Sequence, residues 1–74
     1  MDAAAKRIKQ LESQIAAIQS EARHIEGELA DPTIYGSDGG GAVVRLAQRQ
    51  GELQKDREAL EAEWLELYEQ QETA

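Results

Sequence analysis

Apolar residues recur at alternating steps of three and four through both halves of this 74-residue chain. In the first half they form seam one, which is Ile8, Leu11, Ile15, Ile18, Ala22, Ile25 and Leu29. In the second half, seam two runs through Val43, Leu46, Gln50, Leu53, Arg57, Leu60, Trp64 and Leu67. Residues spaced in this way share one stripe of an α-helix, and the stripe must be covered by another to leave water. The pattern predicts two long helices that pack along their seams.

The segment between the seams cannot be helical throughout. Asp31 precedes Pro32, and the residue before a proline is disfavoured in the α region. Three consecutive glycines at 39–41 weaken helix further, and Ser37 or Asp38 is a candidate cap for the second helix. The predicted elements are a first helix at about 3–30, a loop at 31–41 and a second helix at about 42–71. The predicted fold class is all-α, a single two-helix antiparallel coiled-coil hairpin.

An antiparallel hairpin fixes which seam residues face each other, because the numbers of facing residues add up to a constant. Here the totals alternate between 71 and 72, so that Val43 faces Leu29 and Trp64 faces Ile8. Ala22, the smallest residue of seam one, faces the long amide of Gln50. Matching along the whole seam favours one register, and we expect the isolated chain to be a monomer.

Composition excludes several kinds of site. The chain has no cysteine and one histidine, so thiolate or multi-histidine metal sites are not possible. A two-helix hairpin also has no cleft in which paired carboxylates could acquire shifted pKa values. We therefore expect no catalytic, cofactor-binding or metal-binding residue and no enzymatic activity in this domain. The carboxylates expected on an exposed ridge are Glu58, Glu61, Glu63, Glu66, Glu69 and Glu72.

The polar and aromatic members of seam two have structural interpretations. Gln50 and Arg57 are expected to set the register, with the methylenes of Arg57 lying on the seam while its charge reaches water. Trp64 is expected in the core, although an aromatic ring could also stack on a base or a protein partner.

The charge distribution leaves one candidate binding site. The net charge of −7 disfavours nucleic acid and anionic membranes as partners. No apolar run is long enough to cross a bilayer, and the N-terminus lacks the apolar core of a secretory signal. Three arginines nevertheless lie near the loop. Arg23, Arg45 and Arg49 are therefore candidate phosphate contacts, with ordinary solvated charges as the alternative.

Three short segments carry a family resemblance. These are Leu-Ala-Asp-Pro-Thr-Ile-Tyr at 29–35, Val-Arg-Leu at 44–46 and Glu-Trp-Leu-Glu-Leu at 63–67. With their spacing, they make the chain from about 8 to 69 resemble the C-terminal coiled-coil domain of ABC-F ATPases, especially the Uup branch. The resemblance implies a domain taken from the C-terminus of a soluble, cytoplasmic tandem ATPase. ATP and magnesium would belong to the ATPase modules of the parent chain.

The resemblance also implies a ligand, since the hairpin of this family is associated with DNA in the Uup branch and with ribosomal RNA more generally. Bacterial release factors share the Leu-Ala-Asp-Pro segment but lack the Trp-x-x-Leu element. Valyl-tRNA synthetases end in a similar arm with a different loop. The alternative that needs no family is a coiled coil that acts as a spacer or binds another protein.

Overall fold

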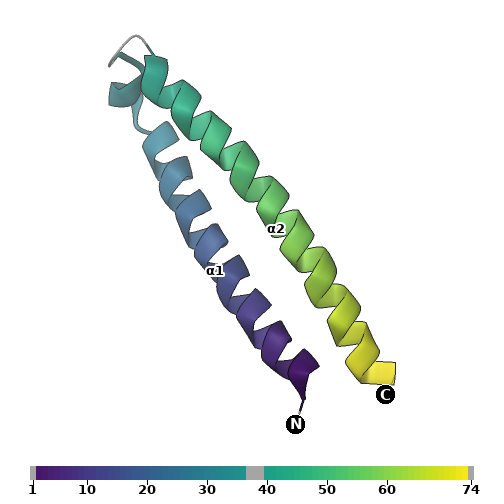
Figure 1. Ribbon diagram of the computed structural model, residues 1–74. Helices are drawn as coiled ribbons and strands as arrows, with labels where there is room; N and C mark the ends of the chain where they lie inside the picture. Colours follow the sequence, from purple (N-terminus) through teal and green to yellow (C-terminus); the bar gives the residue numbers. More distant parts are fainter. Residues whose placement is uncertain (1, 37–39, 74) are drawn as a thin grey trace.

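Two long helices lie side by side in opposite directions in the computed structural model, which describes residues 2–36 and 40–73 (Figure 1). The elements are α1 at Ala3–Leu29, a short 3₁₀ helix, η1, at Pro32–Gly36, and α2 at Gly41–Thr73. The molecule is a rod that measures 55 × 15 × 14 Å between Cα extremes. The predicted all-α helical hairpin is confirmed. No helix in the described part of the chain is long and apolar enough to cross a membrane.

Aspartate side chains form local hydrogen bonds at both ends of α1, with α1 itself at its start and with the first turn of η1 after its end. At the start, the Asp2 carboxylate accepts a hydrogen bond from the backbone N–H of Ala5 at 3.2 Å. At the other end, Asp31 Oδ1 accepts from the backbone N and the Oγ1 of Thr33, at 2.9 and 2.8 Å. These bonds to the charged form lower the pKa of Asp31. The helix ends at Leu29, one residue earlier than predicted.

The segment predicted as a loop contains η1, which the sequence analysis did not predict. Pro32 starts η1, where a fixed φ and a missing N–H cost nothing. The hydroxyl of Tyr35 donates to the carbonyl of Leu29 at 2.6 Å and so satisfies a free carbonyl at the end of α1. The helix α2 starts at Gly41, after Gly40 with a φ of 87°, and runs to Thr73. The predicted caps Ser37 and Asp38 lie outside the described residues.

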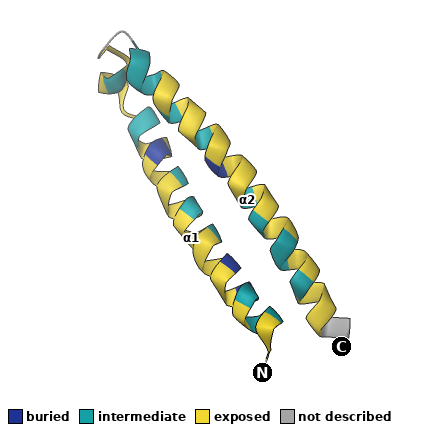
Figure 2. Cartoon of the chain, in the orientation of Figure 1, coloured by how far each residue is buried: buried dark blue, intermediate teal, exposed yellow. Residues whose placement is uncertain are grey.

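Every position of the two seams is buried or half-buried (Figure 2). The buried side chains are those of Ile8, Leu11, Ile25 and Leu53, and Leu11 among them is completely enclosed. The outer surfaces of both helices are exposed almost throughout, as the yellow ribbon in Figure 2 shows. Among the described residues, the core is therefore a single thin strip between two helices, with no second layer of side chains behind it.

Two ion pairs between α1 and α2 show the register in which the helices pack. Arg7 pairs with Glu63, and Glu21 pairs with Arg49, and in each pair the residue numbers add up to 70. Each residue directly precedes a seam position, so the adjacent seam residues have numbers that add up to 72. This agrees with the predicted facing of Trp64 with Ile8.

Candidate functional site

The seam divides the surface of the hairpin into two long sides. One side, termed the ion-pair side, is marked by the Arg7–Glu63 and Glu21–Arg49 pairs. The other, termed the aromatic side, is marked by a hydrogen bond from Trp64 Nε1 to Glu12 Oε2 at 3.3 Å. Residues flanking opposite edges of a heptad seam point to opposite sides of the helix. Any candidate cluster must therefore be placed on one side or the other.

Arg49, one of the three predicted phosphate contacts, is engaged within the molecule. Its Nε and Nη2 donate to Oε2 and Oε1 of Glu21 at 2.6 and 3.1 Å. These hydrogen bonds raise the pKa of Arg49 and lower the pKa of the Glu21 carboxyl. This bidentate arginine–carboxylate pair has favourable hydrogen-bond geometry and links the two helices. A phosphate could use Arg49 only by sharing or displacing Glu21.

The structure brings Arg45 and Arg49 together but places Arg23 elsewhere. Arg45 is exposed and lies one turn before Arg49 on α2, on the ion-pair side. Arg23 is also exposed, but it follows Glu21 by two residues, which is about 200° around the helix. Because Glu21 faces the ion-pair side, Arg23 points towards the aromatic side. The predicted trio is therefore split between the two sides of the hairpin. The spacing of two residues between Glu21 and Arg23 was the signal in the sequence that could have shown this.

Carboxylates surround the two arginines that remain together. Glu52 lies 4.0 Å from Arg49 Nη1, and Glu52 and Asp56 both contribute to the raised pKa of Arg49. His24 Nε2 lies 3.1 Å from the Glu28 carboxylate at the same end of α1. The loop-proximal part of the ion-pair side therefore carries about as much negative as positive charge, which weakens its field towards a polyanion.

The predicted carboxylate ridge is exposed, with one exception. Glu63 is half-buried, because Arg7 Nε and Nη2 donate to its Oε2 and Oε1 at 2.7 and 3.0 Å. This contact lowers the pKa of Glu63 and raises that of Arg7. The exposed members are Glu58, Glu61, Glu66 and Glu69, while the side chain of Glu72 is outside the described part. Within residues 2–36 and 40–73, no three acidic, histidine or cysteine side chains gather to hold a metal ion.

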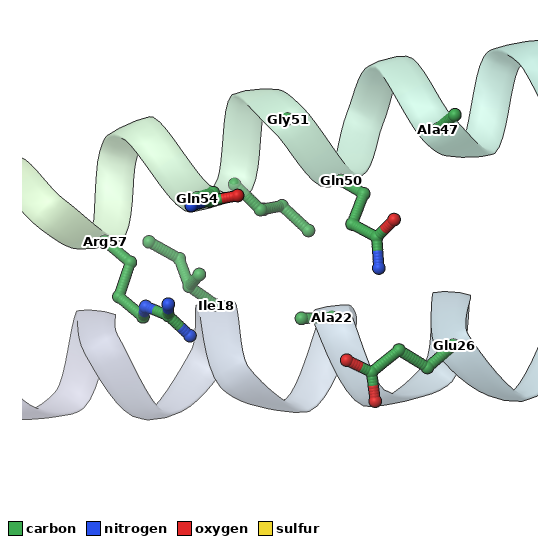
Figure 3. Close-up of a pocket in the computed structure, with 9 residues that line it drawn as sticks. Ile18, Ala22, Glu26, Ala47, Gln50, Gly51, Gln54 and Arg57 are labelled. Atoms are coloured by element: carbon green, nitrogen blue, oxygen red, sulfur yellow. The ribbon is translucent and has the colours of Figure 1, made fainter.

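Small side chains open a groove of about 340 Å³ along the middle of the aromatic side (Figure 3). Ala22, Ala47 and Gly51 leave the space, and the Gln50 side chain extends from α2 towards α1 there. Arg57 Nε is screened from water and lies 3.2 Å from Glu61 Oε1 without forming a hydrogen bond. Arg57 is thus half-buried on the seam, with its aliphatic part packed there. The groove contains no nucleophile and no pair of carboxylates.

The open end of the aromatic side holds a cluster of large side chains, of which only Trp64 was considered as a possible contact from the sequence. Trp64 and Tyr68 stack, with ring centroids 5.1 Å apart and 16° between the planes. Leu65 beside them is 51% exposed and Tyr68 is 42% exposed. Trp64 was predicted in the core and is half-buried on the seam. The spacing of four residues between Trp64 and Tyr68 was the available signal.

Comparison with known proteins identifies a family. The family model of the ABC transporter C-terminal domain matches residues 3–69, which is most of the chain. No curated protein and no solved structure matches this chain. The chain therefore belongs to the ABC transporter C-terminal domain family. The family match confirms the resemblance at the level of such a C-terminal domain.

Proposed function

We propose that this member of the ABC transporter C-terminal domain family is the non-catalytic, C-terminal arm of an ABC-F ATPase of the Uup branch. The family match over residues 3–69 carries the assignment to such an arm, and the described part of the hairpin is a thin rod whose functional groups lie on open surfaces. Such a molecule acts by contact. ATP and magnesium belong to the parent ATPase modules in this proposal, and the parent is cytoplasmic.

The finer part of the proposal is that the loop end contacts nucleic acid, either DNA or ribosomal RNA. Arg45 and Arg49 support it, because they lie one turn apart on the same side of α2 and are both exposed. Two phosphate contacts give weak, sequence-independent binding with a salt slope of only about −2. Arg23 would contribute only to a strand that wraps around the rod.

Titration of labelled single-stranded DNA, double-stranded DNA and RNA at low salt tests this contact. We expect Arg45→Ala/Arg49→Ala to lose binding, while Arg23→Ala/Lys55→Ala, which removes the same charge elsewhere, keeps it. Glu21→Gln should strengthen binding, because it releases Arg49 from its cross-helix partner. Equal affinity of the wild type and the Arg45/Arg49 variant would remove these residues from the proposal.

A protein-contacting arm is the second candidate, and the charge of −7 favours it. A long acidic rod repels nucleic acid and attracts basic protein surfaces. No binding to any of the three nucleic acids at about 50 mM salt would favour this candidate. Under either candidate, two Walker A motifs and two ABC signatures upstream in the parent gene would support the ATPase parent. A separate experiment, sedimentation of the isolated hairpin, would test the expected monomer.

A further inference from the structure

We infer that the open end of the hairpin carries a docking surface for a basic segment of another protein. The surface, termed the aromatic patch, consists of Trp64, Leu65 and Tyr68 of α2 with the carboxylates of Glu12 and Glu61 beside them. It lies at the opposite end of the rod from Arg45 and Arg49. The inference therefore does not rest on the proposed nucleic-acid contact.

The aromatic patch is apolar surface that the hairpin itself does not cover. Leu65 lies outside the seam and is half exposed. Tyr68 flanks the seam at the position that faces Ala5 of α1, and an alanine is too small to cover the ring. Single exposed apolar residues are ordinary, but contiguous ones mark interaction surfaces. Here the exposed side chains of Leu65 and Tyr68 lie next to the half-buried Trp64 on one helix.

The carboxylates of the patch give it the charge of a cation-binding surface. Glu12 of α1 and Glu61 of α2 line the same groove as Trp64, from opposite helices. Like charges thus flank this groove, whereas the ion-pair side places Arg7 against Glu63 at the same end. The bond from the neutral Trp64 N–H leaves the charge of Glu12 in place.

Neighbouring cations do not cancel this negative charge. Arg57 lies 3.2 Å from Glu61, and Lys9 precedes Glu12 by one turn of α1. Over the whole open end, four cations, Lys6, Arg7, Lys9 and Arg57, stand against six glutamates, which are Glu12 and the five within 58–69 of α2. Glu61 forms an ion pair with Arg57, and Glu63 forms one with Arg7. The open end therefore keeps a net negative charge around the half-buried Trp64 and the exposed Tyr68.

This combination selects one class of occupant. A guanidinium or ammonium group is attracted to an aromatic face and to carboxylates at once. A nucleic acid would be repelled by the glutamates, and a second copy of this chain carries the same charge of −7. The occupant that fits is a protein segment with arginine or lysine beside an apolar residue, which would cover Leu65.

Trp64 is the only tryptophan of the chain and lies in the aromatic patch, so its fluorescence can be used to measure binding there. The probe is a tryptophan-free synthetic peptide of alternating arginine and leucine, and the matched control peptide has glutamate in place of arginine. We expect the arginine peptide to change Trp64 fluorescence saturably and the glutamate peptide to leave it unchanged. Added salt should weaken the binding, because the attraction is partly between charges.

Variants locate the binding on the molecule. Leu65→Ser and Glu12→Gln/Glu61→Gln should each weaken the arginine peptide by about fivefold or more. Val44→Ser is the matched control, since Val44 is 56% exposed and lies at the loop end of the same helix. It should leave the affinity unchanged. These positions are exposed, so circular dichroism should show folded variants.

Three results would overturn the inference. The first is equal affinity of wild type, Leu65→Ser and Glu12→Gln/Glu61→Gln for the arginine peptide. The second is binding of the glutamate peptide as tightly as the arginine peptide, and the third is absence of a saturable signal with either peptide.

Discussion

Arg7 and Glu63 are separated by 56 residues in the sequence and form a paired set of hydrogen bonds across the open end of the hairpin. Two heptads along the rod, Glu21 and Arg49 form the same contact with the charges exchanged between the helices. A slip of two heptads would place Arg7 against Arg49 or Glu21 against Glu63. The reversed order of charge therefore disfavours registers shifted by two heptads in either direction.

Exchanging the charges of the first pair tests this role. Arg7→Glu should lower the melting temperature, because it places two carboxylates against each other at Glu63. The double exchange Arg7→Glu/Glu63→Arg should recover most of the loss, since the pair is restored in reverse. Melting followed by circular dichroism measures both. A double variant as unstable as Arg7→Glu alone would show that the contact does not support the fold.

The centre of the seam should carry more stability than any surface position. Leu53 is 2% exposed, so Leu53→Ala should cost about 2–4 kcal/mol through lost burial and a residual cavity. Leu65→Ala, the same change at an exposed site, should stay within about 0.5 kcal/mol of wild type. Urea denaturation compares the two. Equal losses would contradict the observed burial.

Two glycines should respond to alanine with opposite signs. A Cβ at Gly27 meets no atom within 4 Å, so Gly27→Ala should stabilise α1 by about 0.5–1 kcal/mol. Gly40 has a φ of 87°, where an L side chain is strained, so Gly40→Ala should destabilise the hairpin by about 1 kcal/mol. Thermal melting measures both variants. Stabilisation by Gly40→Ala would mean that the entry to α2 does not need this conformation.

Acid should remove the contribution of the two ion pairs. Contacts with Arg7 and Arg49 hold the pKa values of Glu63 and Glu21 below the ordinary value of 4.5. A depressed carboxyl pKa contributes stability that is fully present above the unfolded-state value and is lost as pH falls through the folded-state value. Wild type should therefore melt above Glu21→Gln/Glu63→Gln near neutral pH.

This difference in melting temperature should close as the pH falls below 4.5 and through the lowered pKa values of Glu21 and Glu63, because the wild-type carboxylates are then protonated as well. The paired comparison is needed because acid also relieves repulsion among the other glutamates. A gap that stays constant from neutral to acidic pH would show that the two carboxylates act through something other than their charge.

Much of the fold was predictable because its determinants are local or periodic. The positions of Leu11 and Leu53 in the heptads predicted their burial, and Asp31-Pro32 predicted where the first helix stops. The 3₁₀ helix was missed because it depends on the reach of Tyr35 back to Leu29, which no single-residue preference encodes. Arg23 was grouped with Arg49 by distance along the rod, although their helical phases point to opposite sides.

The sequence by itself determined two amphipathic helices, the breaker between them and the seams along which they pack, since a repeat of three and four residues gathers the apolar side chains of each helix into one stripe that must leave water. Only the tertiary structure decided how the charges are used. It showed that Arg49 is engaged by Glu21, that Glu63 belongs to an ion pair, and that Trp64 and Tyr68 stack beside Glu12. Those contacts depend on side-chain reach across the seam, which becomes defined only when the helices have packed.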